Sequence, residues 1–263
     1  MKLLFIGDVF ANTGIRAIKH LLPSIRKEYQ IDFVVANAEN ATNCKGLCKS
    51  DYEKLMSYGV DFFTMGNHTW NHHDIFDLLV TKNNIIRPAN IKSECVFSQT
   101  GVGTKVVYIN ALKIRITSLI GESIKFKQMQ TNPFFELEAI INNSDPVDFH
   151  LVDIHAETTS EKNAIFFEFQ GKVQAIVGTH THVQTADNRI RNNTAYITDV
   201  GSTGPVDGVI GGKAKNVVDR FKRITEQCII EEQGGLYQFC AALIDFDEKT
   251  KKVQTIDRIL IYE

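Results

Sequence analysis

Long apolar runs, an excess of one charge and a disulfide pattern are all missing from this chain. No apolar stretch approaches the roughly 20 residues that a membrane-spanning helix needs, so we expect no membrane anchor. The net charge of −2 excludes a broad basic surface and argues against duplex nucleic acid as a partner. Linkers, repeats and low-complexity segments are also missing, which predicts a single domain over residues 1–263.

The cysteines predict reduced thiols. Their number is odd, and they are Cys44, Cys48, Cys95, Cys228 and Cys240. Such a set favours a cytoplasmic protein, and the apolar run at residues 3–6 is too short for a signal peptide. We interpret Cys44 and Cys48 as ordinary loop thiols because their spacing is not Cys-x-x-Cys; redox control of a nearby site is the alternative.

Short apolar runs alternate with helical patterns over the first two-thirds of the chain. Strands are predicted at residues 3–6, 33–36, 62–65, 149–154 and 173–177, hairpins at 105–118 and 239–262, and helices at 13–22, 51–58, 133–141 and 160–169. Pro23 should kink or restart the first helix, and Ser50 with Glu53 has the form of a capping box. The pattern predicts an α/β fold of mixed sheets flanked by helices.

Five of the apolar runs end in residues that can bind a metal. These residues are Asp8, Glu39 with Asn40, Asn67, His155, and the pair His180 and His182. Singly, an Asp after Gly is more often a turn residue, and a histidine at a strand end can be a satisfied polar group. Jointly they favour a metal site, because the carboxyl ends of strands meet at one edge of an open sheet.

The mixture of ligand types indicates two metal ions. Carboxylate, amide and imidazole groups suit Mn, Fe or Zn better than Ca or a thiolate-bound metal. A carboxylate between two cations can bridge them, and such a pair activates water and neutralises charge on phosphorus. Histidines one residue apart diverge in an extended segment, so His180 and His182 should lie in a turn.

At this point the chain resembles a known family. Gly7-Asp8, Gly66-Asn67-His68 and the run from Gly178 to His182, in that order, resemble the calcineurin-like metallophosphoesterases. The longer motifs at residues 37–40, 66–70, 153–157 and 178–187 are similar to the YmdB-like subfamily, and the resemblance spans nearly the whole chain. It implies a four-layer α/β/β/α sandwich with metals at the rim between the sheets.

The resemblance also implies a role for each matched residue. One metal would be held by Asp8, Glu39 and His182, with Asn40 as a further ligand or contact. The other would be held by Glu39, Asn67, His155 and His180, so that Glu39 is the bridge. His68 would face the scissile phosphate as the catalytic residue, stabilising the transition state or protonating the leaving oxygen.

Two departures from the wider superfamily favour the subfamily. The broad pattern has Asp-x-His at the first strand, whereas this chain has Phe10 in place of the histidine. The broad pattern also has an Asp as the bridge, whereas this chain has Glu39 followed by an amide.

The activity implied is hydrolysis of cyclic nucleotides, notably 2′,3′-cyclic phosphates, by attack of a metal-bound hydroxide while His68 assists the leaving oxygen. The cofactors would be two divalent ions, with Fe or Mn favoured and Zn the other candidate. The alternative is a regulatory nucleotide- or metal-binding protein with incidental phosphatase activity, and a protein phosphatase is the weaker third hypothesis. A homo-oligomer stays open.

Several features have no role in this interpretation. The glycine-rich residues 201–205 and 208–212 match neither a Walker loop nor a dinucleotide fingerprint, although the resemblance puts a loop near the active rim. His72 and His73 are interpreted as solvated residues at a helix start, with a substrate contact as the alternative. The basic run at residues 213–223 is interpreted as a solvated helix face.

Overall fold

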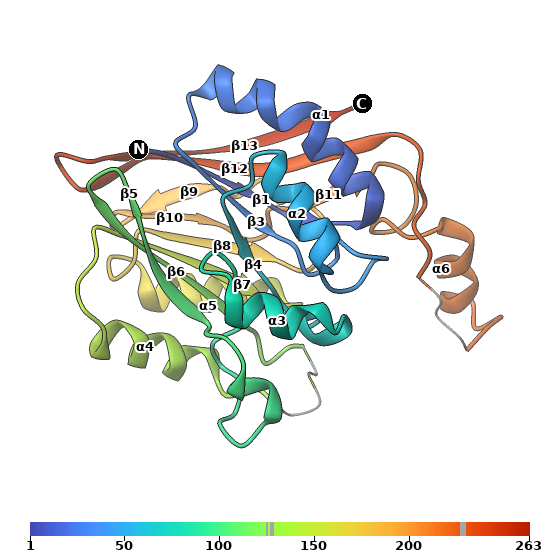
Figure 1. The fold of residues 1–263 in the computed structure, drawn as a ribbon, viewed down its shortest axis with the longest axis horizontal. Helices are drawn as coiled ribbons and strands as arrows, with labels where there is room; N and C mark the ends of the chain where they lie inside the picture. Colours follow the sequence, from blue (N-terminus) through green and yellow to red (C-terminus); the bar gives the residue numbers. More distant parts are fainter. Residues whose placement is uncertain (125, 127–128, 227–229) are drawn as a thin grey trace.

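Two β-sheets pack face to face, and helices cover the outer face of each sheet (Figure 1). The structure, a computed structural model, describes residues 1–124, 126, 129–226 and 230–263, so Cys228 lies outside the described residues. The first sheet has the order β2-β11-β12-β1-β3-β4, with β13 paired to β12; the second has the order β5-β6-β7-β8-β10-β9.

The strands of the first sheet are β1 (Lys2–Ile6), β2 (Asp8–Val9), β3 (Phe33–Asn37), β4 (Phe62–Thr64), β11 (Ser202–Pro205), β12 (Tyr237–Asp247) and β13 (Lys252–Tyr262). Those of the second are β5 (Thr104–Ile109), β6 (Leu112–Ile120), β7 (Phe149–His155), β8 (Ala175–Thr179), β9 (Arg189–Arg191) and β10 (Thr194–Ile197). The helices are α1 (Ala11–Tyr29), α2 (Lys49–Ser57), α3 (Asp74–Thr81), α4 (Pro133–Asn143), α5 (Thr159–Phe169) and α6 (Ala214–Phe221). Short 3-10 turns lie at Thr69–Asn71 and Val96–Gln99.

Three layers of apolar packing hold these elements together. Between the sheets, β1 residues such as Phe5 pack against β7 residues such as Leu151. Helices α1, α2 and α3 pack on the outer face of the first sheet. Helices α4 and α5 pack on the outer face of the second. The predicted four-layer α/β/β/α sandwich is therefore confirmed.

The predicted hairpins and most helices are present, with three local differences. The capping box is wrong: α2 begins at Lys49, whose N–H donates to Asp74 Oδ2 at 2.9 Å, so Ser50 lies inside the helix. Helix α1 continues through Pro23 to Tyr29 and does not restart. The strand predicted at residues 173–177 is β8, at 175–179.

Parallel pairing decides where the site forms. Strands β1, β3 and β4 are mutually parallel in the first sheet, and β6, β7 and β8 are parallel in the second. Parallel strands share one carboxyl edge, so the residues that follow them gather there.

Four of the five cysteines lie among the described residues. Cys44, Cys48, Cys95 and Cys240 are free. Within the described ranges, no helix has both the length and the apolar character that a membrane crossing requires.

Candidate metal centre and its pocket

The two sheets contribute different chemistry to the shared edge. The first sheet supplies oxygen ligands: Asp8 begins β2 directly after β1, Glu39 follows β3, and Asn67 follows β4. The second sheet supplies imidazoles, because His155 ends β7 and His180 follows β8. The site therefore depends on the packing of one sheet against the other.

Four of the predicted ligands form a tight cluster around the ring nitrogen Nε2 of His155. This atom lies 3.1 Å from Glu39 Oε1, 3.1 Å from Asn67 Oδ1 and 3.0 Å from His180 Nδ1. Glu39, His155 and His180 offer ligand atoms that all lie within 4.8 Å of one another. These four residues are the set that the resemblance assigns to one metal.

The other predicted set surrounds the Asn40 side chain. The Asn40 Nδ2 atom lies 3.1 Å from Glu39 Oε1 and 3.4 Å from His182 Nε2. His182 donates its Nδ1–H to the carbonyl oxygen of Ile210 at 3.0 Å, which leaves Nε2 with its lone pair. Rotation of the Asn40 amide would present its oxygen at the same position, so a cation would find three ligand atoms there.

Asp8 completes this second set with an oxygen, Oδ1, that has no hydrogen-bond partner among the described residues and whose charged neighbour is His155 Nδ1 at 3.9 Å. Its side chain is fully buried, and Oδ2 accepts a hydrogen bond from the His180 backbone N–H at 3.0 Å. Oδ1 is buried and accepts no hydrogen bond from the described residues. Burial raises the pKa of Asp8 to about 6, although His182 and His155 oppose the rise. A bound cation would satisfy the orphaned oxygen and favour the carboxylate.

The charges around His155 favour a positive charge at its position. Burial alone would lower the pKa of His155, but the Glu39 carboxylate, with help from Asp8, raises it to about 9. Burial likewise opposes ionisation of Glu39, yet His155 holds the pKa of this carboxyl well below its usual range. Burial and the neighbouring His155 lower the pKa of His180 to about 3, so His180 is neutral. Ionised Glu39 and neutral His180 are already in the forms that bind metal, and a divalent cation would take the place of the proton that His155 carries.

A hydrogen-bond relay sets the orientation of the His155 ring. Its Nδ1 lies 2.8 Å from Thr179 Oγ1, and the Thr179 hydroxyl donates to Asp153 Oδ1 at 2.8 Å. Because the hydroxyl hydrogen goes to the carboxylate, Nδ1 must be the donor to Thr179 and Nε2 keeps its lone pair once a metal displaces its proton. Outer partners of this kind fix the tautomer of a metal-binding histidine.

The segment that carries His180 and His182 is a turn, as the spacing predicts. Both residues have positive φ, 98° and 65°, and both side chains line the same pocket. Asp199 holds the turn by accepting from Thr181 N at 3.1 Å and from Thr181 Oγ1 at 2.7 Å. Lys162 is fully buried and pairs with Asp199 at 2.7 Å, which compensates the buried charge.

Gly66 allows the strand ends to approach. A Cβ at this position would overlap both Glu39 Oε2 and the His155 ring. The close contact between the oxygen and nitrogen ligands therefore depends on the missing side chain.

His68 lies at the predicted place beside the cluster. Its backbone N–H donates to Glu39 Oε2 at 2.9 Å, and its side chain lines the pocket above the metal ligands. Burial lowers the pKa of His68, although Glu39 opposes this. Less of His68 is therefore protonated at neutral pH than the unperturbed value predicts.

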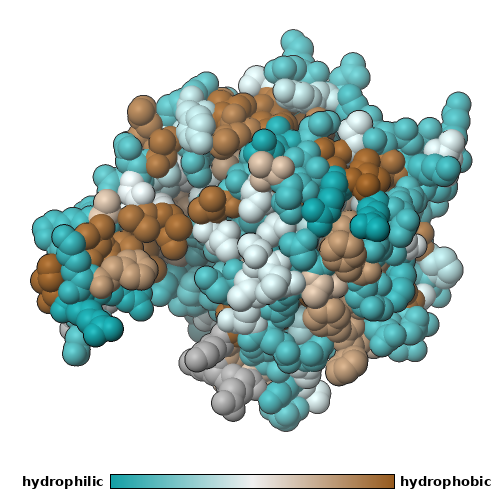
Figure 2. All heavy atoms as spheres, turned by 180° about the vertical axis from the view of Figure 1, so that it is seen from behind, coloured by the Kyte–Doolittle hydropathy of each residue, from teal (hydrophilic) through white to brown (hydrophobic). Residues whose placement is uncertain are grey.

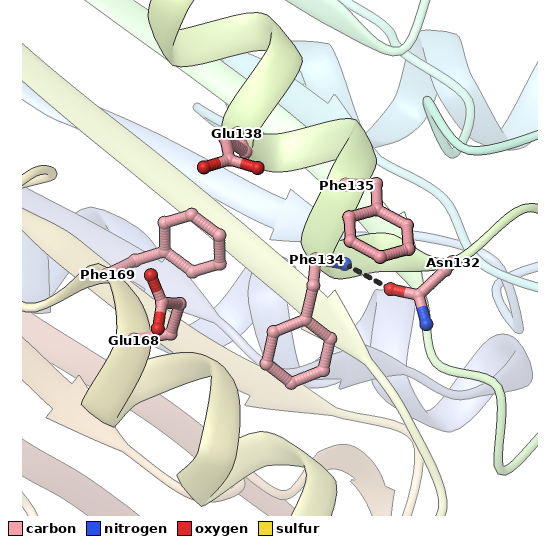
Figure 3. A pocket seen from close by; sticks show the side chains of 6 residues that line it. All are labelled: Asn132, Phe134, Phe135, Glu138, Glu168 and Phe169. Carbon is pink, nitrogen blue, oxygen red and sulfur yellow. Dashed lines mark hydrogen bonds between the residues drawn. The ribbon is translucent and has the colours of Figure 1, made fainter.

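A pocket of about 430 Å³ opens over the cluster. Glu39, Asn40, His68, His180 and His182 line its floor. A second pocket, of about 370 Å³, lies between α4 and α5 (Figure 3). Its lining is phenylalanine, two carboxylates and the Asn132 side chain that caps α4, and it shares no residue with the histidine cluster. The first pocket is the candidate active site.

Of the other sequence candidates, some line this pocket and others do not. Cys44 lines it, and burial raises the pKa of this thiol to about 11, which keeps it protonated and unreactive. Cys48, His72 and His73 do not line it. The redox and substrate-contact alternatives for these three residues thus gain no support.

The sequence did not point to the residues that orient the predicted ligands or hold their segments in place. Asp153 could have been found, because it lies two residues before His155 and side chains two apart in a strand share a face. Lys162 and Asp199 had no such signal, since their pairing joins α5 to the segment after β10. The Ile210 carbonyl that orients His182 lies in the glycine-rich loop that had no assigned role.

Comparisons with known proteins agree with the motifs. The family model described as YmdB-like protein matches residues 4–259. The chain belongs to the YmdB-like family. The 2′,3′-cyclic-nucleotide 2′-phosphodiesterase of Bacillus subtilis is 39% identical to this YmdB-like chain over 264 residues, covering 99% of the chain and 97% of the relative.

Solved structures of similar chains have the same fold. A crystal structure of a novel phosphatase from Mycoplasma pneumoniae is 40% identical, with a TM-score of 0.96, and the match covers 100% of this chain and 93% of that one. A crystal structure of a hypothetical protein from Thermus thermophilus is 34% identical, with a TM-score of 0.90, and covers 100% of both chains. The predicted metallophosphoesterase fold and the YmdB-like resemblance are confirmed.

Proposed function

We propose that this YmdB-like chain is a dinuclear metal-dependent phosphodiesterase that hydrolyses cyclic nucleotides, with 2′,3′-cyclic phosphates as the favoured class. The observation that carries the proposal is the meeting of Asp8, Glu39 and three histidines below a pocket that His68 also lines. Family membership carries the coarser part, since similar chains are named as a phosphodiesterase and a phosphatase. The number of metal ions and the cyclic substrate are the finer part, and we propose them from the residues of the site.

Each ligand set has residues of its own and shares Glu39. In this proposal Asp8, Asn40 and His182 bind one ion, while Asn67, His155 and His180 bind the other. When bound, the two divalent ions would supply an acidified water and neutralise the negative charge that builds on phosphorus. Glu39 Oε1 lies 3.1 Å from both Asn40 Nδ2 and His155 Nε2, so its position between the sets suits a bridging carboxylate.

His68 serves the leaving oxygen. In hydrolysis of a cyclic diester, a bond forms between water oxygen and phosphorus, and the bond from phosphorus to one ribose oxygen breaks. The ribose oxygen then needs a proton. The lowered pKa of His68 makes its neutral form the main species at neutral pH. The neutral ring can donate a hydrogen bond from its N–H to the leaving oxygen as that oxygen gains charge, and the proton that the oxygen finally takes is the one that the attacking water releases.

Two predictions about the whole chain stay part of the proposal. One is a single domain over residues 1–263. The other is a cytoplasmic location with Cys44, Cys48, Cys95 and Cys240 as free thiols.

The test is hydrolysis of 2′,3′-cyclic AMP by protein that has been stripped of metal and reloaded with Mn²⁺ or Fe²⁺. The variant His68→Ala should keep the bound metal and lose most turnover, about 10²–10³-fold for loss of one hydrogen-bond donor to the oxygen that gains charge. His73→Ala is the matched control, because His73 is an exposed histidine outside the pocket.

Either clear failure would change the assignment. Loss of metal together with activity in His68→Ala would make His68 a ligand or a structural residue. Absence of turnover at full metal occupancy would favour the regulatory nucleotide-binding alternative.

A further inference from the structure

The pocket over the metal centre has two chemically different halves. The floor carries the metal-binding and catalytic side chains. The wall is apolar and comes from Phe10 and from the segment after β11, and its members are Phe10, Val209, Ile210, Val217, Phe221 and Ile230. We call this set the apolar wall. Hydrolysis of a small diester requires the floor, but it gives no reason for the wall.

The part of the wall formed by α6 stands away from the sandwich. Figure 1 shows α6 projecting from the end of the molecule, and none of its eight residues is buried. Phe221 at its end is 82% exposed, and Figure 2 shows apolar side chains gathered on this projection. An exposed apolar surface that continues into an active-site pocket marks a ligand-binding site.

Arg220 adds one cation to the apolar surroundings. It lines the same pocket, and its guanidinium has no hydrogen bond or ion pair with any described residue. A planar guanidinium stacks on aromatic rings and donates to ring nitrogens and carbonyl oxygens. The combination of Phe221 and Arg220 therefore suits a flat, heteroatom-rich ring.

The wall is joined to the metal centre through Ile210. Its carbonyl oxygen accepts the hydrogen bond from His182 Nδ1, and its side chain, 52% exposed, faces the pocket. Ile210 has a φ of 48°, which is an unfavourable conformation for a β-branched residue. The next residue, Gly211, packs so closely on the Phe10 ring that a Cβ would overlap it. These contacts hold the wall at a set distance from the ligands.

We propose that the apolar wall binds the nucleobase of the substrate, with Phe221 and Arg220 as the residues that distinguish a nucleotide from a simple phosphodiester. This inference rests on the proposed function, because the cyclic phosphate must lie on the floor for the base to reach the wall. The shared pocket of about 430 Å³ falls within the roughly 300–1,000 Å³ typical of small-molecule sites. The ribose of the bound substrate would lie between the metal centre and the apolar wall.

The experiment compares two substrates that share the five-membered cyclic diester. These are 2′,3′-cyclic AMP, which has a base, and glycerol 1,2-cyclic phosphate, which has none. Phe221→Ala should raise KM for 2′,3′-cyclic AMP by about tenfold, as expected for loss of a stacking contact, and leave kcat/KM for the glycerol compound unchanged. Phe221→Trp keeps an aromatic ring and should restore KM.

The matched control is Val218→Ala. Val218 lies on the same helix and is 39% exposed, but it does not line the pocket, so both substrates should be unaffected. Because Phe221 is exposed, its substitution should not unfold the chain, and circular dichroism with thermal melting checks this.

A second readout separates this inference from the proposed function. Equilibrium binding of adenosine 3′-monophosphate, measured by calorimetry against glycerol 3-phosphate, does not require turnover. In Phe221→Ala, a loss of affinity of about tenfold for the nucleotide alone would support nucleobase binding by the apolar wall, even if the protein hydrolyses neither diester.

Three outcomes would overturn the inference. The first is equal nucleotide binding and KM in wild type and Phe221→Ala while wild type turns over 2′,3′-cyclic AMP. The second is an equal loss of kcat/KM for both substrates in Phe221→Ala, which would mean that Phe221 acts on the metal centre. The third is dissociation of an oligomer in Phe221→Ala with unchanged nucleotide binding, which would assign the wall to a second copy of the chain.

Discussion

Replacing Asp153 with asparagine should weaken metal binding without unfolding the chain. Asp153 is fully buried, and its two oxygens have different partners. Oδ1 accepts from Thr179 Oγ1 at 2.8 Å, and Oδ2 accepts from Thr64 Oγ1 at 2.6 Å and from Asn37 Nδ2 at 3.1 Å. The amide nitrogen of Asn37 can only donate, so the position of Oδ2 requires an acceptor.

This requirement decides how the new amide would sit. The oxygen of the introduced asparagine must take the Oδ2 position, so its nitrogen faces Thr179 and donates to the hydroxyl. The Thr179 hydroxyl then turns and donates to His155 Nδ1, which drives the ring proton to Nε2. A protonated Nε2 cannot bind metal.

The expected effect on metal affinity follows from outer partners of metal-binding histidines. Loss of such a partner weakens binding by about 10–100-fold, which is about 1.4–2.7 kcal/mol. The free energy of unfolding of the metal-free protein should change by no more than about 1 kcal/mol, because the amide has the same shape and every hydrogen bond at the site keeps a partner.

The assay is competition for Mn²⁺ or Zn²⁺ between the protein and a fluorescent chelator, with urea denaturation of the metal-free protein alongside it. Thr179→Val removes the relay and should give a similar loss, whereas Thr179→Ser keeps the hydroxyl and should bind metal like the wild type. Unchanged affinity in folded Asp153→Asn and Thr179→Val proteins would refute the relay.

Three further substitutions test other parts of the structure. Gly66→Ala would place a methyl group onto Glu39 Oε2, so the metal content of the purified variant should fall sharply; full occupancy would show that the strand ends can separate. Lys162→Met leaves Asp199 as an unpaired buried charge and should cost about 3–5 kcal/mol in urea denaturation, and adding Asp199→Asn should recover most of it. Burial lowers the pKa of His150 to about 3 from 6.5, so between these pH values the unfolded chain binds a proton that the folded chain does not. Stability should therefore fall with decreasing pH, by roughly 2 kcal/mol at pH 5 relative to neutral pH, and His150→Gln should lack this loss. The same loss in His150→Gln as in the wild type would assign it to another group.

The sequence by itself determined the candidate ligands and the order of most elements. Each predicted ligand follows an apolar run, and the carboxyl ends of parallel strands in one sheet lie at one edge of that sheet. Local signals also sufficed for the hairpin at residues 105–118 and for α4, which Asn132 and Pro133 begin as predicted. These features depend on neighbours within a few positions in the chain.

Local signals failed where a distant group replaced a near one. Ser50 and Glu53 look like a capping box, but Asp74, which is 25 residues away from Lys49, accepts the hydrogen bond at the start of α2. Strands β10 and β11 were not predicted, because each is short and is stabilised by strands from elsewhere in the chain.

Only the tertiary structure decided which ligands touch and what surrounds them. The first sheet supplies the oxygens and the second supplies the imidazoles, so Glu39 and His155, far apart in the chain, meet only because the sheets pack face to face. The pKa shifts of both residues arise from that contact and from burial, neither of which a sequence pattern encodes. The same holds for the apolar wall: its phenylalanines and isoleucines are visible in the sequence, but their place over the metal centre is a property of the fold.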